Sequence, residues 1–147
     1  MSTPSSNWEI TQTTALAQLA AMLTRADTGP GRASLALFST ARPELITDPH
    51  GDTPQAEIVL ARPSGAIIGS SLVLYVETPS GAMVQSNGLP RWAEWRAADG
   101  AVLARCDVTD MDHGGGLRVI GGATPEGETS PMLYTGGLVR LGIVALS

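Results

Sequence analysis

The spacing of hydrophobic residues changes once along the chain, close to residue 31. Before this point, Leu16, Leu19, Ala20 and Leu23 follow the i, i+3, i+4, i+7 spacing of an amphipathic helix. A threonine at position 11, 13 or 14 can cap the start of this helix, and Gly29-Pro30-Gly31 prevents its continuation. The pattern therefore predicts one helix over about residues 12–26.

After Gly31 the hydrophobic residues alternate with a period of two, which is typical of half-buried strands. In the first such run Leu35 and Leu37 share a face and Phe38 points to the other side. In the second run Ile58 and Leu60 point inward and Glu57 outward. Pro63-Ser64-Gly65 is expected to form a turn. The predicted strands are 33–42, 55–61, 66–68, 71–77, 91–97, 101–108, 117–120 and 138–146, the first of them ending at Arg42-Pro43.

Turn residues recur about every eight to twelve positions, and no second helix is available to connect parallel strands. This spacing predicts a mainly β protein: an antiparallel β-sandwich or jelly roll of about seven to nine strands with one N-terminal α-helix. Residues 1–11 are expected to form a flexible N-terminal arm. Residues 12–147 are expected to form a single domain, with the β-sandwich over about 32–147.

Composition narrows the class of function. The chain has 147 residues, 14 acidic against 9 basic, and a net charge of −5, which disfavours binding to nucleic acid. No apolar run is long enough to span a membrane, and the first residues lack the basic segment of a secretory signal. One cysteine excludes an internal disulfide framework. We expect a protein with neither a nucleic-acid nor a membrane partner.

Cys106 is the first candidate for chemistry. It alternates with Val102, Ala104 and Val108, so we expect it on the inward face, where a thiol packs as a small hydrophobe. The alternative is a nucleophile paired with His113 across a loop. We favour the core position.

Two histidine-containing loops are further candidates. Asp107, Asp110, Asp112 and His113 could converge on a cation, but their spacing lacks the pattern of an EF-hand, and a solvated hairpin loop is the favoured interpretation. His50 has no sequence neighbour expected to shift its pKa, and we predict an exposed loop histidine.

Two other features have simpler structural explanations. Residues 29–34 partly match a phosphate loop, but they follow a helix and precede a strand, which is the wrong order for that function. Trp92 and Trp95 should face opposite sides of a strand, one in the core and one at a surface or interface, where a sugar-binding platform is the alternative. We assign no catalytic, cofactor-binding or metal-binding residue, and we expect a protein that is not an enzyme.

Three segments resemble a group of small proteins encoded by tailed bacteriophages and prophages. They are residues 27–38, with their Gly-Pro-Gly entry to a strand, residues 92–108, and residues 133–141 with a late Gly-Gly. The spacing from Trp92 to Gly100 matches that group, and the likeness spans most of residues 15–145. A second tryptophan at Trp95 and the long loop at 121–131 depart from the pattern.

The resemblance implies a structural protein of the virion, similar to the cement or decoration proteins that cover joints between subunits of the capsid. Its expected partners are the major capsid protein and further copies of itself, as a homodimer or homotrimer. Its expected location is the capsid surface, after synthesis in the host cytoplasm. A tail or head–tail component of the virion is the first alternative. A β-sandwich that binds a glycan or a metal, or that acts as an enzyme, is the second.

Overall fold

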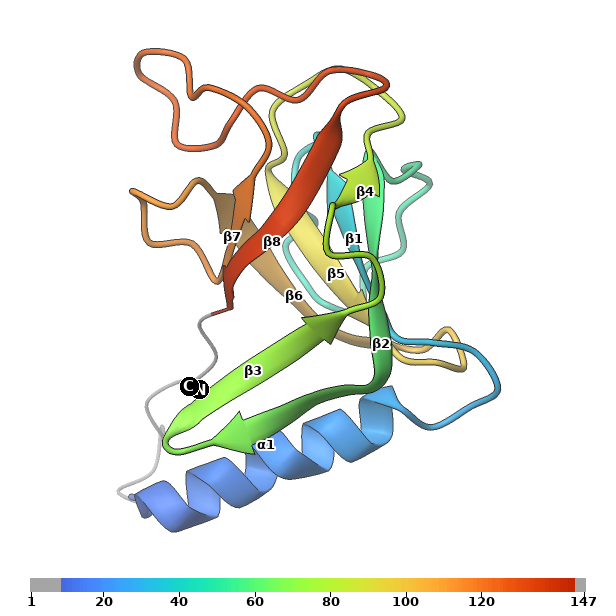
Figure 1. The fold of residues 1–147 in the computed structure, drawn as a ribbon, viewed down its shortest axis with the longest axis vertical. Helices are drawn as coiled ribbons and strands as arrows, with labels where there is room; N and C mark the ends of the chain where they lie inside the picture. The colour runs from blue at the N-terminus through green and yellow to red at the C-terminus, as the bar shows by residue number, and fades with distance from the viewer. Residues whose placement is uncertain (1–8, 145–147) are drawn as a thin grey trace.

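The computed structural model describes residues 9–144, so most of the predicted arm at 1–11 lies outside the described residues. One helix and eight strands follow one another along this part of the chain (Figure 1). Their bounds are α1 (Gln12–Ala26), β1 (Ser34–Phe38), β2 (Ala56–Ile68), β3 (Ser71–Val76), β4 (Ala82–Met83), β5 (Trp92–Arg96), β6 (Val102–Thr109), β7 (Leu117–Ile120) and β8 (Leu138–Val144).

Helix α1 is where the hydrophobic spacing predicts it, and its ends are capped by local contacts. The Thr11 side chain accepts a hydrogen bond from the Thr14 amide at 3.2 Å, which satisfies one of the free amides of the first turn. At the other end, Arg25 suits the helix dipole and forms an ion pair with Asp99. Within the described residues, no helix is both long enough and apolar enough to cross a lipid bilayer.

The strands form one curled sheet in the order β3-β2-β1-β5-β6-β7-β8-β4. The sheet bends into a half-barrel, so that β8 and β4 come to lie opposite β2 and β3 (Figure 1). The mainly β prediction, with one N-terminal helix, is confirmed. A sandwich would have two facing sheets, whereas here the two facing layers are halves of one continuous sheet.

One neighbouring pair corrects the expectation of a wholly antiparallel arrangement. β6 and β7 are parallel, and only Val108 and Thr109 pair with Leu117 and Arg118. The loop between them is therefore no hairpin, because its chain folds back to start again in the same direction. The sequence shows turn residues at this place but carries no signal for the direction in which the next strand runs.

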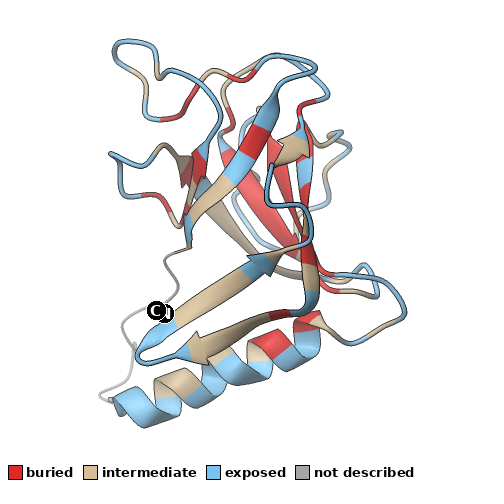
Figure 2. Cartoon of the chain, viewed as in Figure 1, coloured by how far each residue is buried: buried red, intermediate tan, exposed pale blue. Residues whose placement is uncertain are grey.

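The core fills the inside of the half-barrel. Leu35, Leu37, Ile58, Leu60 and Trp95 are buried in it, on the faces that the alternation predicts. β1 lies centrally and is buried along its whole length, because the sheet is covered on both faces there (Figure 2). Helix α1 and the β2–β3 hairpin lie lower in the view and are more exposed.

The predicted turn at residues 63–65 is wrong, because these residues lie within β2. The register shifts between the pairs Leu60–Val76 and Gly65–Leu74, which places Pro63 in a bulge. Proline has no amide hydrogen, but a residue in a bulge does not need one to pair with the next strand. The amide of Ser64 donates to Asp27 Oδ2 at 3.0 Å. A Cβ on Gly65 would lie 2.4 Å from the Val73 carbonyl oxygen, so this bulge requires glycine.

The chain reverses instead at Gly69, between Ile68 and Ser71, which pair across the hairpin. Gly69 has a φ of 62°, while Ser70 keeps a negative φ, as in the two-residue type II′ turn. The hairpin therefore extends further from the half-barrel than the sequence predicts (Figure 1).

Candidate functional site

The densest polar cluster lies on the outer face of the sheet, beneath the loop of residues 39–54. Its centre is Glu94 on β5, whose side chain is 2% exposed. We define the Glu94 cluster as Glu94, Arg96, Arg105 and His50, together with the aromatic pair Phe38 and Trp92. Strand alternation places Trp92, Glu94 and Arg96 on one face, opposite the face that carries Trp95 into the core.

Three donors surround the Glu94 carboxylate. Arg105 Nε donates to Oε2 at 2.9 Å, Arg96 Nε donates to Oε1 at 3.0 Å, and His50 Nε2 lies 3.1 Å from Oε2. His50 Nδ1 accepts from the Asp52 amide, so the neutral ring carries its proton on Nε2 and donates it to Glu94. Burial acts to raise the pKa of Glu94, but these hydrogen bonds outweigh it and the pKa lies below its ordinary value.

Arg105 connects this carboxylate to the covering loop. Besides its bond to Glu94, it donates to the carbonyl oxygens of Leu45 at 3.0 Å and Asp48 at 3.1 Å. Its guanidinium also lies over the Trp92 ring, 5.4 Å from the centroid. The charge of Arg105 is stabilised in this position by three oxygen acceptors and by an aromatic face.

The aromatic pair forms the apolar half of the cluster. Phe38 and Trp92 stack with centroids 4.2 Å apart, and the edge of the His50 ring contacts both of them. Trp92 Nε1 donates to Thr40 Oγ1 at 3.4 Å. The loop of residues 39–54 is thus held to the sheet by aromatic contacts and by hydrogen bonds of charged side chains. The cluster therefore braces this loop.

This geometry corrects two sequence-based expectations. His50 is not an exposed loop histidine, because its side chain is only 14% exposed and bonds Glu94. Glu94 is 44 residues away in the chain, so no local signal could reveal the pair. Trp92 and Trp95 do face opposite sides, as predicted, but both are buried, so the outward ring of Trp92 is no sugar-binding platform. A usable signal did exist: Glu94 and Arg96 share the strand face of Trp92, at a spacing of two.

Residues of the acidic loop do not converge. Asp107 pairs with Arg42 at 3.0 Å, on the side of the sheet that carries the 39–54 loop. Asp110 instead bonds His113 Nδ1 at 2.7 Å, the backbone amide of Asp112, and the Thr124 hydroxyl. The hydrogen bond from Thr124, followed by that from His113, lowers the pKa of Asp110 to about 2.

Asp110 therefore acts as an anchor for its own loop. Within residues 9–144 no three His, Cys, Asp or Glu side chains stand close enough together to hold a metal ion. The glycine segment at 29–31, which partly matches a phosphate loop, contacts another part of the protein. The carbonyl oxygens of Gly29 and Gly31 both accept hydrogen bonds from Arg62 Nη1 at 2.6 Å.

Cys106 packs against the core and lines a small apolar pocket of about 70 Å³ with Trp95 and Leu117. Val102, expected on the same face, is exposed, because the register between β5 and β6 shifts at Trp95 and Arg96. Burial, opposed by Arg42, raises the pKa of the Cys106 thiol to about 11. His113 bonds Asp110 and is not the partner of the thiol.

We expect Cys106 to react slowly with thiol reagents in the native state. At pH 8 a thiol with a pKa of about 11 has roughly a hundredfold less thiolate than an unperturbed cysteine. Labelling with a disulfide reagent should therefore be at least about a hundredfold slower in buffer than in urea. Equal rates in the two conditions would show an accessible, ionised thiol and contradict the packed position.

A scan against protein-family models, a search of curated proteins and a search of solved structures each find no match to this chain.

Proposed function

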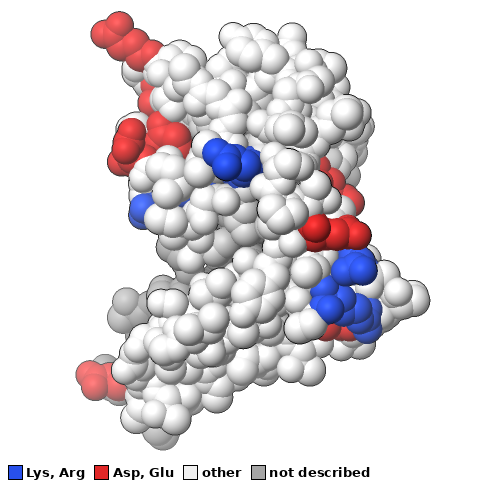
Figure 3. All heavy atoms as spheres, viewed as in Figure 1, with Lys and Arg blue, Asp and Glu red and all other residues white. Residues whose placement is uncertain are grey.

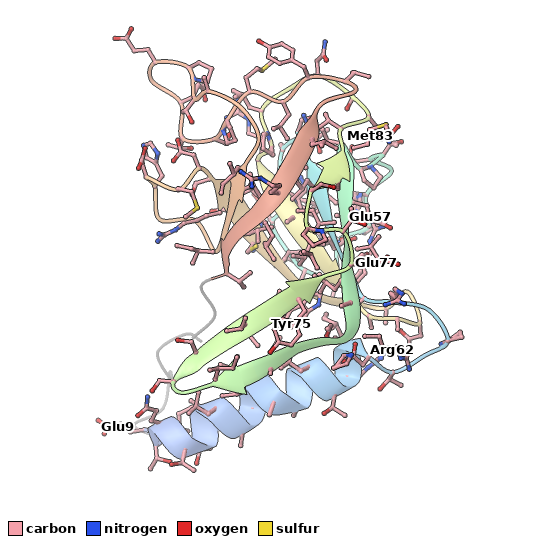
Figure 4. All side chains as sticks on the ribbon, in the orientation of Figure 1. Glu9, Glu57, Arg62, Tyr75, Glu77 and Met83 are labelled. Atoms are coloured by element: carbon pink, nitrogen blue, oxygen red, sulfur yellow. The ribbon has the colours of Figure 1, made fainter. Side chains whose placement is uncertain are left out.

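We propose that this protein is a non-enzymatic structural component of a tailed-phage particle, a capsid cement or decoration protein that binds the major capsid protein and stabilises the head. The observation that carries the proposal is the placement of its exposed apolar side chains. Five of the twelve large apolar side chains that are exposed in the described part of the chain lie on two separate surfaces, one toward each end of the molecule, as the positions of Met83 and Tyr75 show in Figure 4. A protein that fastens two neighbours needs two such surfaces.

The first surface surrounds β4 and the start of β8. Met83 and Leu138 pair across these strands, and both side chains are about half exposed. Tyr134 precedes Leu138 in the chain and is 62% exposed. Exposed side chains of this size and polarity mark sites of protein contact when they form one patch. We define Met83, Tyr134 and Leu138 as the β4 surface and assign the capsid contact to it.

The second surface is the outer face of the β2–β3 hairpin. We define the hairpin face as Ala66, Ile68, Ser71, Val73 and Tyr75. Strand alternation separates these residues from Ile67, Leu72 and Leu74, which pack against the core. The solvent face of an antiparallel hairpin is ordinarily polar, so an apolar face in this position supports a partner-binding role.

The ionisable and nucleophilic residues that could take part in catalysis support the same proposal, because they are bonded to other residues of the protein or buried. Glu94 and Arg105 brace the loop at 39–54, and Asp110 anchors its own loop. The burial of Cys106 keeps its thiol protonated. The part of this chain that can bind a partner is therefore its outer surface, and the internal contacts of these polar residues stabilise the fold beneath it. The resemblance of residues 27–38, 92–108 and 133–141 to small phage proteins gives the class of particle.

A tail or head–tail component of the virion is the second candidate, because the same two surfaces would serve a contact there. Copy number separates the two. Electron cryomicroscopy of the virion and quantitative protein analysis of purified particles should find hundreds of copies on the head. Dozens or fewer, at one vertex or along the tail, would support the second candidate. A protein absent from virions would contradict both.

A charged substitution tests the β4 surface. Tyr134→Glu should reduce incorporation into capsids at least about tenfold, because a carboxylate would be desolvated against the partner. The measurement is co-sedimentation of purified protein with capsids that lack it. Gln18→Glu, which places the same charge on the exposed side of α1, is the matched control and should bind normally. Equal binding by both variants would contradict the assignment of this surface.

A further inference from the structure

We propose that the hairpin face binds the hairpin face of a second copy of this chain, so that the protein forms a two-fold symmetric dimer. This inference goes beyond the proposed capsid role, because the dimer would form in free protein without a capsid. It gives the second of the two surfaces described above, the hairpin face, a second copy as its partner, while the capsid contact stays assigned to the β4 surface.

The hairpin face has the composition of an interface. Ile68, at the tip, is 56% exposed and Tyr75, near the other end of β3, is 37% exposed. Val73 and Ala66, which pair with each other across the hairpin, are half-buried between them. Aromatic and aliphatic residues with charges only at their margin, as Glu77 beyond Tyr75 is here, distinguish the centre of a protein interface from the rest of a surface.

The absence of charge extends across the whole region around the hairpin. No charged residue occurs in residues 10–24, which include most of α1, or in residues 63–76, which include the hairpin. Figure 3 shows this end of the molecule as a broad uncharged area, with the charged side chains at its margins and on the half-barrel. The charged side chains of the described residues all lie outside these two stretches.

This distribution favours a second copy as the partner. A two-fold interface brings a surface against itself, so any charge close to the axis meets the same charge on the other copy. The chain has a net charge of −5, and an approach through most of its surface would bring like charges together. The hairpin face is a region in which two copies can meet without that repulsion.

Among residues 9–144, the strand edge beside this face is also without a strand partner. β3 is the outermost strand of the sheet and pairs only with β2 among the described strands. Its residues carry no charge and no proline, the devices by which proteins usually protect such an edge. Beside it, residues 71–74 and 141–144 line a groove of about 280 Å³, and all eight of them are uncharged.

A two-fold contact requires a surface that is complementary to itself, and a projecting side chain beside a groove meets this requirement. In such an interface, when residue i of one copy contacts residue j of the other, j also contacts i. Ile68 projects at the hairpin tip, and the groove begins next to it at Ser71. Each copy can therefore place its hairpin tip against the groove of the other, which buries both apolar sets at once.

Sedimentation velocity on the full chain over about 1–100 µM tests this proposal. We expect a reversible dimer whose dissociation constant rises at least about tenfold in Tyr75→Glu, because each new carboxylate would lose water within an apolar interface. Tyr134→Glu is the matched control: it makes the same change at a more exposed tyrosine outside the hairpin face, and it should dimerise normally.

Ile68→Glu provides a second variant, at the turn of the hairpin, and should weaken the dimer in the same way. Circular dichroism and urea unfolding confirm that each variant is folded. A monomer at every concentration, a trimer, or equal loss of dimer in Tyr134→Glu would overturn the inference. Capsid binding by Tyr134→Glu is read separately, so failure of the dimer and failure of the capsid role are distinguishable.

Discussion

Glu94→Gln should lower the free energy of unfolding by about 3–5 kcal/mol, because it removes the only carboxylate among two arginines and a histidine in the Glu94 cluster. Arg105 is the critical partner, since its side chain is 5% exposed and cannot regain water without moving the covering loop. The measurement is urea unfolding at pH 7, followed by tryptophan fluorescence.

The matched control is Glu57→Gln. Glu57 is the other carboxylate near Arg96, at 3.8 Å, but about half of its side chain is in solvent. An exposed pair of this kind contributes at most about 1 kcal/mol. Equal losses in the two variants would mean that burial of the Glu94 charge does not determine the stability of the cluster.

The same substitution predicts a dependence on pH. Because the pKa of Glu94 is lowered on folding, its ionised form contributes stability above the ordinary carboxyl pKa of 4.5, and this contribution is lost as the pH falls through the lower, folded value. Wild type and Glu94→Gln should therefore differ at pH 7 and become more alike at pH 3. A difference that is equal at both pH values would indicate lost packing in place of lost charge.

Trp92→Ala should cost about 3–5 kcal/mol of stability and release the loop at 39–54. Trp92 is fully buried and supports that loop through its stacking on Phe38, its edge contact with His50 and its bond to Thr40. Hydrogen exchange under native conditions should show the amides of residues 39–54 exchanging faster than the core strands do.

Trp95→Ala is the control for this local effect. Trp95 is equally large and is buried on the opposite face of β5, within the core of the half-barrel. Its truncation should cost a similar free energy, but loop exchange should rise only in step with global unfolding. Loss of loop protection to the same degree in both variants, after correction for stability, would contradict the bracing role of the cluster.

The elements of this fold could be predicted to the extent that they depend on local pattern. Leu35 and Leu37 face the core and Phe38 the outer side, as their alternation indicates, and the helix ends where Gly29-Pro30-Gly31 stops it. Pro63 was misleading because proline ends a strand only where its amide is needed for the ladder. Here the bulge leaves that amide unneeded, and the compensating contact comes from Asp27, 37 residues from Ser64.

The candidate site could not be predicted, because its members are distant in sequence. Glu94 and Arg105 oppose each other only through the register of β5 and β6, and His50 joins them from a loop 44 residues away. The sequence suggested Asp107, Asp110 and His113, which are close along the chain, but Asp107 is drawn away by Arg42 from 65 residues earlier.

The sequence by itself determined the helix, most of the strands and their core faces, and the uncharged stretches at 10–24 and 63–76, because periodicity, turn chemistry and composition act over a few neighbouring residues. Only the tertiary structure decided that the strands form one curled sheet with a parallel pair, that the loop at 39–54 covers a second apolar layer, and that the hairpin face is exposed. Register and loop placement depend on contacts between residues far apart in the chain, for which a single sequence carries no periodic signal.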